Sequence, residues 1–365
     1  IFVVKIKNIM KVCVIGSGLT SLTLAKTLVN QGIYVDVFSN FKTKKLDKSR
    51  TLSISKSNID FYNSNVLNIE RLLWKINKIE IYNKFHQNKK ILTFNDKNQL
   101  FSVVKNFKLY NLIISNLKKS SFFKIKKIQN NENFLKKNYK LIINCDFDNY
   151  FTKKYFYKKI NKNYKSQAYT TIIKHKKLIN NDVATQIFTE KGPIAFLPIS
   201  NKETSIVYSV KGKDNIDLKK YIKIYNSKYS ILEIGKISKF GLKSSQLRSY
   251  YYDNILAFGD LIHKIHPLAG QGFNMTLRDI KLLSDLISNK INTGLDLDST
   301  ICKDFEKKIK HKNFIFSNGI DLIYEFFNLE SKFNNSILTK SLNLLGKNNS
   351  INNFLTRLAD KGIVV

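Results

Sequence analysis

The residues with the clearest chemical potential lie late in the chain, between positions 255 and 283. An apolar run at 255–258 ends at Gly259-Asp260, so a strand is expected to end there with a carboxylate beyond it. A turn-rich segment follows, and Gly270-Gln271-Gly272 precedes a helical pattern that starts at Phe273. Glycines let a ligand approach bare backbone, and a helix start favours an anionic or electron-rich group. Asp260 is placed to accept hydrogen bonds from sugar-like hydroxyl groups.

A second glycine-rich turn lies near the start of the sequence. The apolar run 11–15 predicts a buried parallel strand, and Gly16-Ser17-Gly18-Leu19-Thr20-Ser21 then opens a helical pattern. Residues 33–38 predict the next strand. The three parts form a βαβ unit of the dinucleotide-binding type, with Ser21 at the position of the third glycine. Gly16 and Gly18 would seat a pyrophosphate; the alternative is an ordinary βα turn.

The acidic residue that holds the adenosine ribose in such units is absent from the end of the second strand. Ser39 takes that place, and a neutral hydrogen bond is weaker than a charged one. Asp36 lies three residues earlier, within the strand, so its side chain is expected to face elsewhere. We therefore expect weaker cofactor binding on the same fold.

Together these segments resemble the FAD-dependent aromatic-ring hydroxylases (class A flavoprotein monooxygenases), especially those of ubiquinone biosynthesis. The second flavin motif of that family reads roughly GDAAHxxHPxxGQGxNxGxxD. This chain matches it at Gly259, Asp260, His263, His266, Pro267, Gly270, Gln271, Gly272, Asn274 and Asp279. The resemblance implies that Asp260 holds the ribityl chain and that the turn from Pro267 to Asn274, with Phe273, lies against the isoalloxazine ring.

The resemblance extends to two segments that carry cofactor contacts in the family. Arg50 opens the segment 50–55, which is similar to the RxxALS segment whose arginine reaches the flavin; a surface arginine is the alternative. Asp146 follows the buried strand 141–145 where the family has a DG motif, but Phe147 replaces the glycine and Lys153 stands for a later arginine. These departures bear on reduction of the flavin by NAD(P)H.

A third segment, 192–199, is similar to the family's GPxAxLPL, which lies in an antiparallel substrate sheet. The resemblance implies that Phe188, Phe196 and Pro198 line the substrate. The alternative is that aromatic residues in strands are core residues.

The implied fold is α/β: a Rossmann-like FAD-binding domain, an inserted antiparallel-sheet substrate domain and a helical C-terminal region, as in p-hydroxybenzoate hydroxylase. We expect the FAD-binding domain at 10–75, 100–160 and 237–300, the substrate sheet at 76–99 and 161–236, and C-terminal helices at 301–365. The helical patterns there cover 301–316, 320–329, 337–345 and 351–358. Residues 320–327 are apolar enough to contact a membrane or a second subunit, with packing on the FAD-binding domain as the alternative. Residues 1–9 are expected to be an extension outside the fold.

The composition narrows the classes of partner. The formal charge is +35, yet only five of the 62 basic residues are arginine, and the lysines are spread along the chain. A solvated lysine-rich surface is the main interpretation, attraction to an anionic membrane is the alternative, and nucleic acid is not expected. Three isolated cysteines indicate free thiols in a reducing compartment. His263 and His266 lack the further ligands of a zinc site, so no metal is expected. A cytoplasmic location, peripheral on the inner face of a membrane, follows as an expectation.

The activity implied by the resemblance is hydroxylation of an aromatic ring by FAD and O₂ through a C4a-hydroperoxyflavin, with NAD(P)H or another electron donor. The implied substrate is a prenylated phenol of ubiquinone biosynthesis. Ser39, Phe147 and Lys153 leave open a non-catalytic or weakly FAD-binding scaffold in a quinone-biosynthesis complex. A flavin oxidoreductase acting on another aromatic or prenyl-lipid substrate is also open. The sequence assigns neither a catalytic residue nor an oligomeric state.

Overall fold

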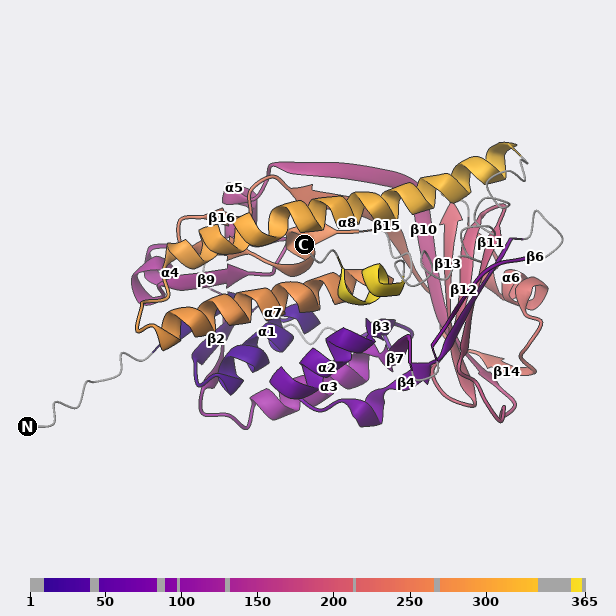
Figure 1. Ribbon diagram of the computed structural model, residues 1–365, viewed down its shortest axis with the longest axis horizontal. Helices are drawn as coiled ribbons and strands as arrows, with labels where there is room; N and C mark the ends of the chain where they lie inside the picture. Colours follow the sequence, from indigo (N-terminus) through magenta and orange to yellow (C-terminus); the bar gives the residue numbers. More distant parts are fainter. Residues whose placement is uncertain are drawn as a thin grey trace, which may run out of the picture.

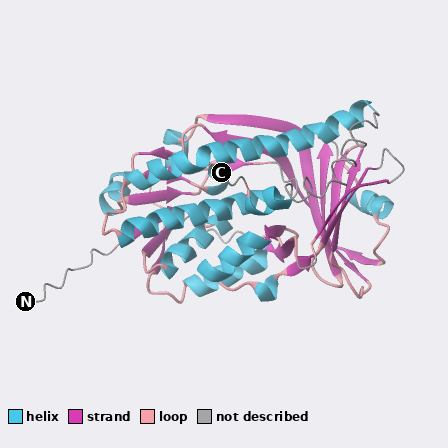
Figure 2. Ribbon diagram, viewed as in Figure 1, coloured by secondary structure: helices cyan, strands magenta, loops and turns pink. Residues whose placement is uncertain are grey.

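The computed structural model describes residues 10–39, 46–83, 89–96, 99–128, 132–212, 215–265, 270–333 and 356–362. Figure 1 shows an elongated molecule in which a layered helix-and-sheet half adjoins a large twisted sheet. Figure 2 shows that most helices belong to the first half. Within the described part of the chain, no helix has the length and apolar character needed to cross a membrane.

The first half is built on a six-stranded sheet. Its strand order is β16 (Tyr251–Tyr252), β17 (Ile255–Ala257), β9 (Leu141–Asn144), β1 (Lys11–Ile15), β2 (Tyr34–Phe38) and β8 (Phe123–Lys126). All neighbours are parallel except β16 and β17. Strand β1 reads KVCVI, and its last four residues are buried, as expected for a parallel strand covered on both faces. The helices of this half are α1 (Leu19–Asn30), α3 (Asn106–Leu117), α4 (Glu132–Asn138), α5 (Tyr150–Tyr155) and α7 (Gln271–Asn292). Helix α8 (Ser299–Phe333) begins in this half and ends beside the large sheet (Figure 1).

The second half is a nine-stranded sheet. Its order is β18 (His263–Lys264), β15 (Ser238–Leu247), β10 (Lys159–His175), β13 (Glu203–Lys211), β12 (Gly192–Pro198), β11 (Val183–Thr189), β5 (Lys78–Asn83) and β6 (Lys89–Asn95), with β14 (Ile231–Ile234) paired to β10. The expected antiparallel sheet is thus mixed, because β11 and β5 run parallel. Strands β15 and β18 come from the stretch that the sequence assigned to the FAD-binding domain.

The two faces of this sheet meet different neighbours. One face is covered by α6 (Leu218–Tyr225), whose Leu218 and Ile222 pack into an apolar core with Phe196. The other face meets β3 (Thr51–Ser55), where Thr51 Oγ1 lies 2.9 Å from Ser205 Oγ. We refer to these as the α6 face and the β3 face. Because side chains alternate along a strand, each residue of β12 can be assigned to one face.

A three-stranded sheet lies beside the larger one. It consists of β3, β7 (Phe101–Lys105) and β4 (Trp74–Ile76), and α2 (Lys56–Asn65) follows β3 directly. The expected strand-to-helix segment at 50–55 is therefore present. Trp74 of β4 is half-buried and donates from Nε1 to the Asn181 carbonyl at 2.7 Å.

One C-terminal expectation is wrong. The sequence predicts two helices, at 301–316 and 320–329, but α8 is one continuous helix across this region. Gly319 lies inside it, and an isolated glycine lowers helix stability by about 1 kcal/mol without ending the helix. Ile320 packs with Met275 of α7, so this part of α8 contacts the first half of the molecule. The predicted helix at 337–345 lies outside the described residues, and residues 356–361 are helical.

Candidate cofactor site

Three turns converge at the carboxyl edge of the six-stranded sheet. Strands β1, β9 and β17 are parallel neighbours, so the turns that follow them meet at one edge, where open α/β sheets bind ligands. A Cβ atom added to Gly259 would lie 2.6 Å from Thr20 Cγ2, and one added to Gly16 would lie 3.6 Å from the Asp146 nitrogen. The first βα turn, Asp146 and the Gly259-Asp260 turn therefore lie next to one another, and we call the sheet edge between them the cofactor recess.

The first turn presents bare backbone to this recess. Gly16 has φ +119°, and a Cβ there would lie 2.9 Å from Ser21 Oγ, so the turn fits closely around the buried Ser21. Gly18 is the N-cap of α1, and no side chain caps this helix. A Cβ at Gly18 would have no neighbour within 4 Å. The first N–H groups of α1 are thus open to an anionic group such as a pyrophosphate.

Asp260 stands at the border of the same recess. It lies in the short 3-10 turn Gly259–Leu261 and is exposed, whereas both neighbours are buried. Although its side chain is exposed, burial of the carboxyl among the atoms around this turn raises the pKa of Asp260 above its ordinary value, and the nearby charges of His263, Lys264 and Arg50 offset part of this shift. A carboxylate in such a place can accept hydrogen bonds from hydroxyl groups of a ligand.

Arg50 lies close enough to influence this carboxylate. It precedes β3, is exposed, and its guanidinium carbon is 5.1 Å from the centre of the Phe240 ring on β15. The structure therefore brings Arg50 to the same side of the molecule as Asp260.

The start of α7 is fixed tightly against β3. Gly270, the N-cap of α7, has φ +65°, and a Cβ there would lie 2.9 Å from Ser53 Cβ. The Asn274 side chain accepts from the Ser55 nitrogen (2.9 Å) and donates to the Ser53 carbonyl (3.0 Å). Since both ends of this amide bind β3, the Asn274 side chain positions the helix, and its expected contact with the cofactor stays a prediction.

Other residues of this turn remain available. A Cβ at Gly272 would meet its first neighbour only at 3.9 Å, and Phe273 is half-buried against the core. Gln271, in the first turn of α7, has a buried Oε1 with no hydrogen-bond partner in the described structure. Pro267 and His266 lie outside the described residues.

A buried pair of polar side chains, His263 and Asp279, lies near Asp260. His263 Nε2 is 2.5 Å from Asp279 Oδ2, and Asn313 Nδ2 of α8 is 3.4 Å from Asp279 Oδ1. Burial alone would lower the pKa of His263, but the charge of Asp279, with that of Asp260, raises it above the ordinary value. The pair joins β18, which follows the Asp260 turn, to α7.

The structure also places the residues that depart from the family motifs at the adenosine end of the site and in the DG-like segment. Asp36 is buried and bound by Lys11 (2.9 Å) and Lys126 (2.8 Å), so it faces away from the recess as expected. Ser39 is buried at the end of β2, and its N–H donates to the Lys126 carbonyl. Phe147 is 38% exposed, and Lys159 Nζ lies 5.7 Å from the centre of its ring.

The expected substrate residues divide between the two faces of the nine-stranded sheet. Phe196 packs in the core under α6, with its ring 6.2 Å from that of Tyr229, and Pro198 follows it on the same face by alternation. The alternation turns both side chains away from β3, and their expected contact with the substrate stays a prediction. Phe188 is on the β3 face and stays a candidate; it pairs in register with Pro193.

Three residues of the recess were not singled out from the sequence. Thr20 touches the Gly259 turn, Ser53 touches Gly270, and Cys145 adjoins Gly16. Burial raises the pKa of the Cys145 thiol to about 12, and the charges of Asp146 and Asp260 add to this. Thr20 and Ser53 lie within the two quoted motifs, which is the signal that points to them.

These residues fit FAD. Bare backbone at Gly18 suits the pyrophosphate, the exposed Asp260 suits a ribityl chain, and the orphaned Gln271 Oε1 offers an acceptor at the start of α7.

Comparison with known proteins agrees with this fit. Residues 216–305 match the FAD binding domain family. The chain is 24% identical over 274 residues to the ubiquinone biosynthesis monooxygenase COQ6 of Schizosaccharomyces pombe, covering 61% of this chain and 57% of that protein. It is 30% identical over 156 residues to 3-demethoxyubiquinol 3-hydroxylase of Escherichia coli, covering 40% of each. The chain thus spans less than two thirds of either relative.

The fold is shared with solved structures over nearly the whole chain. Klebsiella pneumoniae HpxO, solved with FAD and uric acid, has a TM-score of 0.73 at 12% identity and covers 97% of this chain and 98% of its own. Pseudomonas aeruginosa PqsL, a probable FAD-dependent monooxygenase, has a TM-score of 0.68 at 14% identity over 91% of this chain and 99% of its own. The fold is that of the FAD-dependent monooxygenases, as the sequence predicted. The resemblance to the ubiquinone-biosynthesis hydroxylases is confirmed by these relatives.

Proposed function

We propose that this protein is an FAD-dependent monooxygenase that hydroxylates the aromatic ring of a prenylated phenol in ubiquinone biosynthesis. The observation that carries the proposal is the convergence of Gly18, Asp260 and the start of α7 on one recess, fixed by the contacts of Gly259 with Thr20 and of Gly270 with Ser53. The names of the curated relatives supply the substrate class.

The residues of the chain would each hold a different part of the cofactor. Reduced FAD, when bound, would react with O₂ and so supply the oxygen-transfer chemistry. Backbone N–H groups at Gly18 and the start of α1 would bind the pyrophosphate, and Asp260 would accept hydrogen bonds from the ribityl hydroxyls. The positive end of α7 would face the electron-rich pyrimidine edge and stabilise negative charge there. NAD(P)H or another donor provides the electrons.

The substrate would lie on the β3 face of the nine-stranded sheet. This face looks toward the first half of the molecule, as the contact between Ser49 Oγ and Thr170 Oγ1 (3.2 Å) demonstrates. Phe188 is buried on the same face and offers an aromatic surface to a ring. We propose in addition that the protein works at a membrane surface, because a prenylated phenol is a lipid.

The direct test uses the purified protein, a prenylated phenol, FAD and NADH under air. We expect bound flavin, NADH consumption that depends on the phenol, and a product heavier by one oxygen atom in mass spectrometry. NADH consumption without an oxygenated product would favour an oxidoreductase of another kind.

A second candidate, a scaffold that binds FAD weakly or not at all, is favoured by Ser39 and Lys153, which replace charged or bidentate contacts by weaker ones. Fluorescence titration with FAD separates the two. Failure to bind FAD at micromolar concentration would favour the scaffold.

A further inference from the structure

One side of helix α8 is uncovered and carries large apolar residues. Phe314 is 50% exposed, Ile315 is 58% exposed and Leu322 is 70% exposed. Phe316 and Ile320, on the other side of the helix, pack into the cluster that joins α8 to α7. A helix on a protein surface normally presents polar residues to solvent. Exposed apolar residues that gather on one side of a helix therefore indicate an interaction surface.

The residues on this side of α8 follow a heptad spacing. Positions 304, 308, 311, 315, 318, 322 and 325 are separated alternately by four and three residues, and all are at least partly exposed. Since two helical turns take about seven residues, these positions form a nearly straight stripe along α8. The stripe consists of Asp304, Lys308, His311, Ile315, Asn318, Leu322 and Glu325, and we call it the α8 stripe. Heptad spacing lets a second helix pack along the first, and the apolar part of this stripe lies in its middle.

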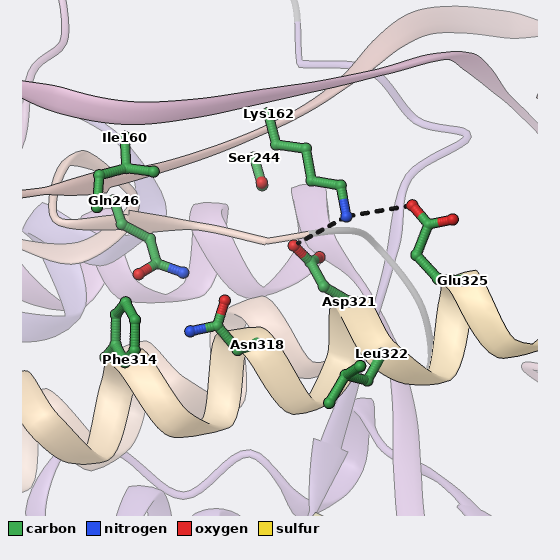
Figure 3. A pocket seen from close by; sticks show the side chains of 9 residues that line it. All are labelled: Ile160, Lys162, Ser244, Gln246, Phe314, Asn318, Asp321, Leu322 and Glu325. Carbon is green, nitrogen blue, oxygen red and sulfur yellow. Dashed lines mark ion pairs between the residues drawn. The ribbon is translucent and has the colours of Figure 1, made fainter.

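A groove of about 400 Å³ lies beside the middle of the stripe. Phe314, Asn318 and Leu322 form its wall on α8, and Ile160 and Gln246 lie on the facing strands β10 and β15 (Figure 3). Ile160 is itself 50% exposed, so the strand side of the groove also presents apolar surface. A helix that docks on the stripe would therefore find room for its apolar side chains between α8 and these strands.

The charges on this side of α8 are divided between its two parts. The part before Phe314 carries three exposed lysines and one exposed carboxylate, which are Lys303, Lys307, Lys308 and Asp304. The part after Phe314 carries Asp321 and Glu325. Both carboxylates pair with one ammonium group, that of Lys162, at 3.6 Å and 3.2 Å (Figure 3). The first part is therefore net positive, whereas the group of Lys162, Asp321 and Glu325 has one net negative charge.

We propose that α8 pairs in antiparallel orientation with α8 of a second copy of this chain. A twofold axis at Asn318 brings Ile315 of each copy against Leu322 of the other, because the two positions lie almost equally far from 318 on opposite sides. It also brings the positive part of each helix to the Asp321–Glu325 end of the other, so unlike charges meet at both ends of the contact. A parallel pair would instead place lysines beside lysines.

The α8 stripe is self-complementary, as a twofold contact between identical chains requires. From position 304 to position 325 it is about 30 Å long, since a helix rises about 1.5 Å per residue. A contact between two single helices is small among specific interfaces, so we expect a dimer that forms reversibly as concentration rises. Pairing through α8 requires no reaction at the cofactor recess.

Sedimentation velocity of the full chain between about 1 and about 100 μM measures this pairing. Each copy has a formal charge of +35, so the buffer should hold about 150 mM salt or more to screen the repulsion between copies. We expect the weight-average mass to rise with concentration from that of one chain toward that of two.

Ile315→Asp places a carboxylate in the apolar middle of the stripe. The variant should stay monomeric over the whole range of concentration, because the contact would bury this charge without a partner. The position is exposed, so thermal unfolding should be nearly unchanged. Ile179→Asp is the matched control, since Ile179 is 93% exposed outside α8, and it should dimerise like the wild type. If Ile315→Asp does not fold, Leu322→Asp makes the same test.

Cysteine cross-linking tests the orientation of the pair. Asn318→Cys should form a disulfide between copies under mild oxidation, because position 318 lies on the proposed axis and faces itself. His311→Cys should form none, since the two copies of position 311 would lie about 20 Å apart. Cys13 and Cys302 are buried and Cys145 is half-buried, so the wild-type chain should give little background.

A wild-type protein that stays monomeric at about 100 μM would overturn the proposal. A dimer that persists in Ile315→Asp would overturn it too, as would an equal loss of dimer in Ile179→Asp. Efficient cross-linking through His311→Cys would show a parallel pair and refute the antiparallel contact. An Asn318→Cys dimer that does not cross-link would refute the position of the axis.

Discussion

His263 Nε2 lies 2.5 Å from Asp279 Oδ2, and both side chains are almost completely removed from solvent. The pair connects the strand that follows the Asp260 turn to the helix whose start carries Gly270 and Gln271. Two parts of the cofactor recess are thus held at a fixed separation by one buried interaction. Asn313 of α8 supports it through the other carboxylate oxygen.

Replacing Asp279 should expose the energetic role of this pair. Asp279→Asn removes the charge that raises the pKa of His263, so the imidazole should lose its proton, and the loss of a hydrogen bond between charged groups should destabilise the fold by about 1.5–3 kcal/mol. The wild-type contribution is fully present below about pH 6.5 and is lost as pH rises through the folded-state pKa. Urea unfolding between pH 6 and pH 9 measures this dependence, which should flatten in the variant. An unchanged pH profile would contradict the assignment.

Asp260→Ala should weaken FAD binding while leaving stability almost unchanged. The carboxylate is exposed and has no hydrogen bond within the described structure that its removal would break, and a hydrogen bond to a charged group contributes about 1.5–3 kcal/mol. We expect the Kd for FAD, measured by fluorescence quenching, to rise about tenfold or more. Asp285→Ala, at an exposed position of α7, is the control and should bind FAD normally. Normal retention of FAD by the Asp260 variant would refute its role.

Gly270→Ala tests the contact between α7 and β3. A side chain at φ +65° costs about 1–2 kcal/mol by itself, and this Cβ would also lie 2.9 Å from Ser53 Cβ. Gly294→Ala is a matched control, since Gly294 has φ +71° but no neighbour within 4 Å of an added Cβ. Both variants should lose stability in thermal unfolding, and only Gly270→Ala should also lose FAD affinity. Equal effects of the two on FAD binding would show that the contact does not shape the recess.

The three thiols should be inert in the native protein. Burial raises the pKa of Cys13, and it raises those of Cys145 and Cys302 to about 12, so little thiolate exists at pH 8. Ellman's reagent should therefore react with them only after unfolding in guanidinium. A native protein in which one thiol reacts at once would mean that the recess beside Cys145 is more hydrated than its surroundings indicate.

Local sequence patterns predict much of the fold and the glycine-rich turn on one side of the recess. The run at 11–15, the glycines at 16 and 18 and the strand at 34–38 define the βαβ unit because each signal lies within a few residues of the next. The directions of the Phe196 and Pro198 side chains did not follow, because the motif fixes the strand but not which of its faces meets the cofactor domain. The parallel pairing of β11 with β5 joins segments about a hundred residues apart, which no local pattern encodes.

The saturated amide of Asn274 was also beyond sequence reasoning. Its partners, the backbone groups of Ser53 and Ser55, become visible only when β3 and α7 are placed side by side. The same is true of the interaction between His263 and Asp279: the motif contains both residues but does not state that they touch.

The course of strand β10 has a consequence for how the molecule unfolds. Its first residues, from Lys159, pair with β15 close to the helical half, and its last, up to His175, lie within the large sheet. In Figure 1 this strand runs along the molecule from one half into the other. The backbone of β10 therefore belongs to both halves. We expect that neither half unfolds while β10 stays paired in the other. Heat or denaturant should unfold the described structure in one cooperative transition, without a populated intermediate in which only one half is folded.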